Sequence, residues 1–336
     1  MSTRVRAKTA KLIQPQQYDK LLLMELPEIA KFMEETEYKR EIDELALKES
    51  GERLILHALM LNQVRTFKHI HDMAPPRFAS LFNEYLREWD VGNIKVILRC
   101  LVSCEDKEEA RALLVPLGSL DFHFISSLLD KKDASDVISA LKSTDYAPVF
   151  KGVDAVDQAS LTRISVALDD FVLKNVSAIV EVAEEGRQFT DFMKLRADVE
   201  NFKMLLKLKK EGIPYSEARV YFTHIGSLPV ERLVSLYKLS FDEVFAFLRS
   251  MPVGSFVEPG IAEFNSDRSL GLLEVGLDRY LLGHGRSLLR QHPLSIAPVL
   301  GFISAKVAEV KNIRTIVRGK HARLDNAFIR KYLITV

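Results

Sequence analysis

A short pattern of acidic, apolar and basic residues around an asparagine occurs three times in this chain of 336 residues. Each copy reads acidic, apolar, any residue, asparagine, apolar, basic. The copies are Asp90–Lys95, Asp198–Lys203 and Glu309–Arg314, and their asparagines, Asn93, Asn201 and Asn312, follow one another at nearly equal intervals. Self-similarity at a fixed period indicates tandem copies of one structural unit.

Further matches keep the same register over a longer stretch. Glu109-Ala110-Arg111 matches Glu217-Ala218-Arg219, Gly118-Ser119-Leu120 matches Gly226-Ser227-Leu228, and Thr36-Glu37-Tyr38 matches Thr144-Asp145-Tyr146. The chain ends at Val336 before it would reach a third Gly-Ser-Leu turn, so we expect the third copy to be truncated. The repeat therefore predicts three units of about 112 residues, at 1–117, 118–225 and 226–336.

Apolar residues recur at steps of three and four along most of the chain, which is the spacing of one helix face. Glycine and proline number only 15 and 12, too few for a turn-rich β-sandwich or a loop-rich α/β enzyme. We therefore predict an all-α fold. Helix breaks are expected at Pro75-Pro76, Ala147-Pro148, Gly212–Pro214, Pro252–Gly260, Gly283–Gly285 and Pro293.

Units of this size can each hold a small helical core, and three of them can stack in series or surround a pseudo-threefold axis. In a helix, the acidic residue and the asparagine three positions later share one side. We interpret Asn93, Asn201 and Asn312 as structural residues, whose amides cap or bridge the backbone of a neighbouring helix. A polar contact with a partner protein is the alternative.

The sequence lacks the common catalytic and cofactor-binding motifs. It contains no phosphate-binding loop, dinucleotide fingerprint, zinc-protease motif or nucleophile elbow, so we predict no catalytic residue, cofactor site or metal site. Cys100 and Cys104 are the only cysteines, and we expect both to be reduced. No uncharged stretch reaches the ~18 residues that span a bilayer. We expect a cytosolic protein that meets a membrane only through a partner.

Charge is balanced overall but not locally. The formal net charge of +1 disfavours nucleic-acid binding. The stretch 306–331, however, holds eight basic residues against two acidic ones, and the stretch 1–20 is also basic. Arg314, Arg318, Lys320 and Arg323 are candidate contacts with an acidic partner. A solvated helix face is the other interpretation.

Several segments resemble one known family. They are Pro298–Ile303, Lys306, Glu309–Ile316 and Gly319-Lys320 near the end, and Arg4–Lys8, Tyr18–Leu22, Glu35–Tyr38 and Trp89–Ile94 earlier. Together they are similar to the C subunit of the archaeal A-type (V/A-type) ATP synthase, which is related to the d subunit of eukaryotic V-ATPases. The resemblance runs from Arg4 to Leu333 and is most specific near the C-terminus.

This resemblance implies a funnel-like, all-helical protein of three similar domains around a pseudo-threefold axis. It also implies a non-catalytic central-stalk subunit on the cytoplasmic face of the cell membrane, between the membrane rotor ring and the central shaft. Rotor-ring and shaft subunits would be its partners, and the four basic residues would contact one of them. The competing hypothesis is a free-standing helical adaptor that binds acidic soluble partners.

Overall fold

A computed structural model describes residues 2–74, 76–153, 156–180, 186–290 and 295–335. These residues form 18 α-helices and two short 3₁₀ helices, and none of them lies in a β-strand. The predicted all-α class is therefore confirmed.

The chain forms two compact units. One consists of Met1–Met73 and Leu236–Val336, and the other of Ala74–Ser235. We call them the terminal unit and the central unit. The terminal unit joins the two ends of the chain, whereas the central unit is continuous in sequence. The three repeat units at 1–117, 118–225 and 226–336 stay a prediction.

The terminal unit contains ten helices among its described residues: α1 (Ser2–Thr9), α2 (Pro15–Leu23), α3 (Leu26–Met33), α4 (Lys39–Leu45), α5 (Gly51–Asp72), α14 (Phe241–Ser250), α15 (Gly254–Asp267), α16 (Gly271–Arg290), α17 (Ala297–His321) and α18 (Asn326–Lys331). The central unit contains α6 (Pro76–Ser103), α7 (Lys107–Arg111), α8 (Phe122–Leu129), α9 (Ala134–Leu141), η1 (Ala147–Phe150), α10 (Gln158–Val180), α11 (Gly186–Glu211), α12 (Tyr215–Ala218) and η2 (Arg219–Tyr221). Helix α13 (Val230–Lys238) crosses the boundary.

The three signature asparagines lie in the three longest of these helices. Asn93 is in α6, Asn201 in α11 and Asn312 in α17, helices of 28, 26 and 25 residues. Each follows another long helix, α5, α10 or α16, which is itself preceded by shorter helices. The order of short helices followed by two long ones thus recurs three times along the chain.

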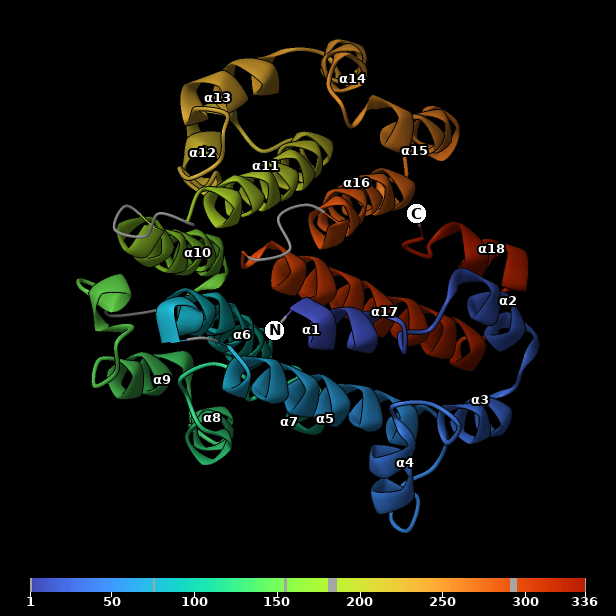
Figure 1. The fold of residues 1–336 in the computed structure, drawn as a ribbon. Helices are drawn as coiled ribbons and strands as arrows, with labels where there is room; N and C mark the ends of the chain where they lie inside the picture. Colours follow the sequence, from blue (N-terminus) through green and yellow to red (C-terminus); the bar gives the residue numbers. More distant parts are fainter. Residues whose placement is uncertain (1, 75, 154–155, 181–185, 291–294, 336) are drawn as a thin grey trace. The chain divides into compact units, whose positions relative to one another are not determined.

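In the terminal unit, α17 lies among α1, α5 and α16, and α2, α3 and α18 also contact it (Figure 1). Side chains from both ends of the chain share one hydrophobic core here: Leu21, Ile29 and Ile55 belong to the same cluster as Ile313 and Ile316. Burial of these side chains removes apolar surface from water and holds the two ends of the chain together.

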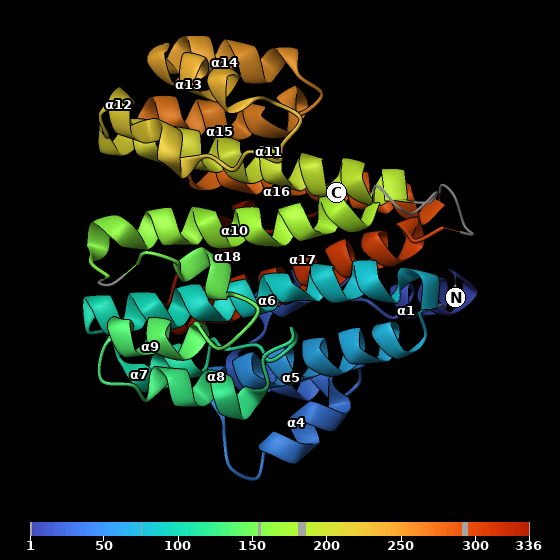
Figure 2. The same ribbon diagram turned by 90° about the vertical axis from the view of Figure 1, so that its left-hand side faces the viewer.

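In the central unit, α10 packs along α6, and α7, α8 and α9 also contact α6 (Figure 2). Each of these three short helices is preceded directly by an N-cap aspartate, namely Asp106, Asp121 and Asp133. The carboxylates accept backbone N–H groups of the first turn, which would otherwise have no partner. Local capping therefore fixes where the short helices start.

The expected break at Gly283–Gly285 is wrong, because these residues lie inside α16. A Cβ atom on Gly285 would lie 2.8 Å from Cβ of Ser304, and one on Gly301 would lie 2.4 Å from the carbonyl oxygen of Gly285. The glycines serve the close approach of α16 and α17 rather than a turn.

The break expected over Pro252–Gly260 is only partly right. Helix α14 ends at Ser250 and α15 begins at Gly254, but Pro259 then lies inside α15. The break at Gly212–Pro214 is confirmed, because α11 ends at Glu211 and α12 begins at Tyr215.

The remaining expectations concern prolines and cysteines. Pro76 begins α6, and Pro148 lies in η1. Pro75 and Pro293 lie outside the described residues. Both cysteines are free, with Cys100 buried in α6 and Cys104 exposed just after it.

Candidate functional site

Each signature asparagine exchanges two hydrogen bonds with one residue of the backbone, 22 positions later. The Asn93 amide donates to the Val115 carbonyl at 2.8 Å and accepts from the Val115 N–H at 2.8 Å. Asn201 makes the same two bonds with Thr223, at 3.1 and 2.9 Å. Asn312 makes them with Ile334, at 2.9 and 2.6 Å. All three asparagines are buried. The partner lies in the irregular segment after the next short helix, α7, η2 or α18, and not in a neighbouring helix.

The acidic residue three positions before the asparagine binds a second stretch of backbone. Asp90 accepts from the N–H and hydroxyl of Ser119 at 2.6 and 2.9 Å, from the Leu120 N–H at 3.2 Å and from the Tyr146 hydroxyl at 3.0 Å. Asp198 accepts in the same way from the N–H groups of Ser227 and Leu228, at 3.0 and 3.2 Å. We call each acid with its asparagine an anchor, because together they tie a long helix to other segments of the chain.

Burial and hydrogen bonding act in opposite directions on these two carboxyl groups. Burial raises the pKa of Asp90 and of Asp198, while the N–H donors that they bind lower it. Burial, followed by the charge of Asp90, raises the pKa of Tyr146 well above its usual range. The tyrosine therefore stays protonated and can donate to the carboxylate.

The glycine of the repeated Gly-Ser-Leu turn lies directly against the carboxylate. A Cβ atom on Gly118 would lie 2.1 Å from Cγ of Asp90, and one on Gly226 would lie 2.1 Å from Oδ1 of Asp198. No side chain fits between the turn and the acid. This close approach explains why both turns carry glycine.

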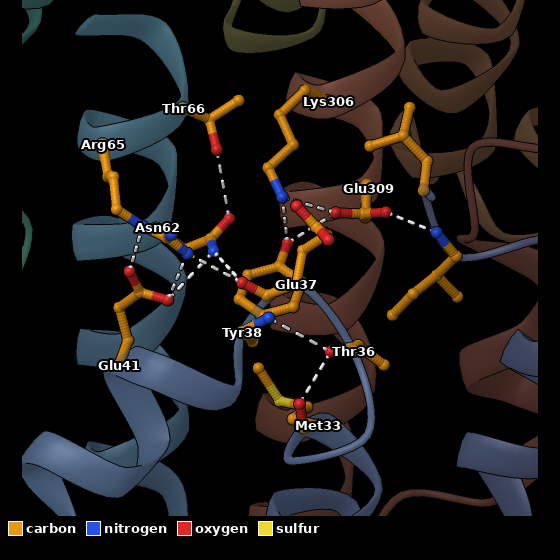
Figure 3. Close-up of polar contacts among 12 residues, drawn as sticks. Met33, Thr36, Glu37, Tyr38, Glu41, Asn62, Arg65, Thr66, Lys306 and Glu309 are labelled. Atoms are coloured by element: carbon orange, nitrogen blue, oxygen red, sulfur yellow. Dashed lines mark hydrogen bonds and ion pairs between the residues drawn. The ribbon is translucent and has the colours of Figure 1, made fainter. Parts of the chain in front are cut away.

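The third anchor has the same chemistry but takes its donors from the start of the chain. One oxygen of Glu309 accepts the Ile13 N–H at 2.5 Å, and the other accepts the Tyr38 hydroxyl at 2.6 Å and Lys306 Nζ at 2.7 Å (Figure 3). Lys306 Nζ also donates to the Tyr38 hydroxyl oxygen, at 2.9 Å. Tyr38, Lys306 and Glu309 are all at most 3% exposed.

A buried charge is tolerated when it is paired and its remaining hydrogen-bonding positions are filled. Glu309 meets that condition through Lys306 and two further donors. Burial, followed by the charge of Glu309, raises the pKa of Tyr38, so that its hydroxyl keeps the proton that it donates. The group is thus a stable polar cluster, in which Tyr38, Lys306 and Glu309 are hydrogen-bonded to one another.

A second polar group lies beside this cluster. Arg65 Nε lies 2.6 Å from Glu41 Oε1, and the Asn62 amide donates to Glu41 Oε2 at 3.0 Å and to the Glu37 carbonyl at 2.6 Å (Figure 3). The Lys11 ammonium donates to the Glu37 side chain at 2.8 Å, which lowers the pKa of that carboxyl group. These contacts attach α5 to α4, and attach both α5 and the start of the chain to the turn before α4.

The four basic residues predicted to contact a partner do not form one cluster. Arg314 and Arg318 lie one turn apart on α17, with Arg314 half-buried and Arg318 exposed. Burial, followed by the charge of Arg318, lowers the pKa of Arg314. Lys320 points to another side of α17, and Arg323 is exposed after the helix ends, with φ of 55°. Only Arg314 and Arg318 share a face.

The sequence reasoning missed Lys306 and Tyr38 as partners of Glu309. One signal was present, since Tyr38 and Tyr146 occupy matching positions of the repeat and each donates to the acid of an anchor. Over the described part of the chain, no group of three His, Cys, Asp or Glu side chains could hold a metal ion. No helix in that part is long and apolar enough to cross a membrane.

Residues 1–332 match the family described as ATP synthase (C/AC39) subunit. The chain belongs to this family. It is 33% identical to the A-type ATP synthase C subunit of Methanococcoides burtonii, over 99% of this chain and 93% of that protein. For the same subunit of Haloferax volcanii the identity is 32%, over 98% and 95% of the two chains. For that of Archaeoglobus fulgidus it is 29%, over 98% and 94%.

The asparagine anchors lead to a prediction about stability. Replacing Asn201 with alanine leaves the N–H and carbonyl of buried Thr223 without their partner. We expect the free energy of unfolding of the isolated protein to fall by about 2–6 kcal/mol, at about 1–3 kcal/mol for each of the two unpaired groups, in urea titration followed by circular dichroism. Asn83→Ala, at an exposed position of α6, is the control and should change it by less than about 0.5 kcal/mol. Equal effects of the two variants would contradict a special role for Asn201.

A second prediction concerns the two glycines nearest the first anchor. Gly118→Ala places a methyl group against the Asp90 carboxylate and should destabilise the protein by about 2 kcal/mol or more. Gly92→Ala, in α6, meets nothing within 4 Å and should stabilise it by up to about 1 kcal/mol through higher helix propensity. Thermal unfolding of both variants measures the difference. A neutral Gly118→Ala would show that the turn is not held against the acid.

Proposed function

We propose that this chain is the non-catalytic central-stalk subunit of a rotary A-type ATP synthase. It would couple the membrane rotor ring to the central shaft, so that ion-driven rotation powers ATP synthesis. The observation that carries this proposal is the match, over nearly the full length of both chains, to relatives named as the C subunit of A-type ATP synthases. Its partners would be the ring and shaft subunits of the synthase.

A part that transmits torque must resist deformation, and cross-connections between helices support that role. In the central unit Lys95 of α6 pairs with Asp169 of α10 at 2.6 Å, and Glu88 of α6 pairs with Arg196 of α11. In the terminal unit Gly285 and Gly301 allow α16 and α17 to pack closely against each other. Densely packed helices with such connections deform little, because each displacement opens voids or breaks hydrogen bonds.

Under this proposal the chain lies at the cytoplasmic face of the cell membrane and is held there by its partners. Arg318 and Arg323 supply exposed positive charge at the end of α17 for contact with an acidic surface of the ring or shaft, and Lys320 adds a partly exposed one. Arg314, being half-buried, would contribute less to such a contact.

The proposal is tested by purification from native membranes, with a salt wash before detergent extraction. We expect the chain to remain with the other parts of the ATP synthase after the wash, because a docked subunit is held by more than screened surface charge. Recovery of the chain without any other part of the synthase would contradict the proposal and favour the free-standing adaptor.

Charge reversal at Arg318 tests the basic contact. Arg318→Glu should leave the circular dichroism and the thermal unfolding midpoint of the isolated protein unchanged, because the residue is exposed at the surface of α17. We expect its affinity for the ring or shaft subunits to fall about fivefold, which corresponds to about 1 kcal/mol. Lys48→Glu reverses an exposed charge elsewhere in the terminal unit and should have no effect. Equal assembly of both variants would rule out Arg318 as a contact.

A further inference from the structure

The third anchor differs from the other two in where its backbone donors come from. Asp90 and Asp198 bind N–H groups 29 and 30 residues further along the chain, at the turns that precede α8 and α13. Glu309 binds the N–H of Ile13, 296 residues away, just before α2. In both settings the bound N–H lies a few residues ahead of a short helix, and a tyrosine hydroxyl completes the contact at Asp90 and at Glu309.

Ile13 therefore occupies, in the third anchor, the position that Ser119 and Ser227 occupy in the others. We propose that residues 2–14, which we call the strap, form a detachable segment that completes the third anchor from a distant part of the chain. Glu309 is the binding site for the strap, and the Ile13 N–H is the group that it recognises. The strap closes the terminal unit when it is bound and opens that unit when it is released.

The strap has two buried apolar side chains, Val5 and Ile13, and Ile13 belongs to the hydrophobic core that contains Ile313. Its remaining contacts are weak individually. Helix α1 packs on α17, but of its described side chains only Val5 is buried, and a helix of eight residues is marginal by itself. The ion pair of Lys11 with Glu37 is largely exposed, with side chains 61% and 40% accessible, and such pairs contribute little. The attachment of the strap therefore depends on the buried hydrogen bond to Glu309 together with the apolar side chains of Val5 and Ile13.

A cavity beside the joint leaves one side of the strap without packing. It has a volume of about 380 Å³ and is lined by Leu12, Ile13 and Glu309, and by Leu282 and Arg286 of α16. Side chains at its wall lose the van der Waals contacts that a filled interior would provide. The joint thus has open space on one side, although the Ile13 side chain packs in the same hydrophobic core as Ile313.

The cation beside Glu309 makes release of the strap possible. Lys306 lies 2.7 Å from Glu309, so the carboxylate stays paired with a buried positive charge when Ile13 leaves. The residue at the same offset before Asp90 is Arg87, which pairs instead with Asp145 and Glu84, at 2.7 and 3.1 Å.

Detaching the turn from Asp90 would therefore be more costly. The buried carboxylate would keep the Tyr146 hydroxyl but no paired cation, and a buried charge without such compensation is strongly disfavoured. Of these two anchors, only Glu309 is suited to reversible opening.

Hydrogen exchange of the isolated full-length chain, read by mass spectrometry, tests the strap. Glu309→Gln removes the charge that binds the Ile13 N–H, and we expect amides of residues 2–14 to exchange at least about tenfold faster than in the unaltered protein. Asp90→Asn is the matched control, because it weakens the equivalent contact at the turn before α8. It should speed exchange at residues 118–120 and leave the strap unchanged.

A second pair of variants changes Ile13 itself, whose side chain is buried in the core, and the two differ in whether they keep the recognised N–H. Ile13→Pro abolishes the N–H but leaves the contacts among Glu309, Lys306 and Tyr38, and it should release the strap as Glu309→Gln does. Ile13→Val keeps the N–H and should leave exchange within about twofold of the unaltered protein. Trypsin, which cuts after Arg4, Arg6, Lys8 and Lys11, gives an independent readout of release.

The proposal is overturned if Ile13→Pro and Ile13→Val expose the strap equally. It is also overturned if Asp90→Asn exposes the strap as much as Glu309→Gln, since the effect would then be general destabilisation. The experiments use the isolated chain, so their outcome does not depend on the proposed role in a rotary synthase.

Discussion

The arrangement of segments around the long helices depends on one interaction, the binding of backbone N–H groups by a buried carboxylate. Asp90 and Asp198 each hold a turn that precedes a short helix, and Glu309 holds the segment before α2. The asparagine one helical turn later holds a second piece of backbone. Each of the three longest helices is thereby connected at two points, and the positions of the bound segments follow from those of the acid and the amide.

Such anchors stabilise a fold mainly by raising the free energy of alternative arrangements of the chain. A buried acid or amide that loses its partners keeps its desolvation cost, so partly formed arrangements are disfavoured more strongly than the bound state is favoured. In the terminal unit, the apolar core shared by Leu21 and Ile316 supplies the general attraction between elements, and the anchor of Glu309 and Asn312 selects one register within it. This combination favours a stiff body.

Part of the candidate site could be predicted from the sequence. The repeated acid and asparagine stood out because they recur at nearly equal intervals. Their partners did not, since Val115, Thr223 and Ile334 contribute only backbone groups, and backbone binding places no demand on the side chain. The prediction at Gly283–Gly285 failed for a related reason: a glycine that permits close helix packing and one that ends a helix look the same in sequence.

The sequence by itself determined the all-α class, the three occurrences of the signature and membership of a family of ATP synthase subunits. These properties follow from local periodicity and from residue identities, which can be read along the chain. Only the tertiary structure decided that Glu309 takes its donor from Ile13 and pairs with Lys306 and Tyr38. That arrangement depends on hydrophobic burial bringing the two ends of the chain together, and contacts between positions so distant in the sequence leave no local signal.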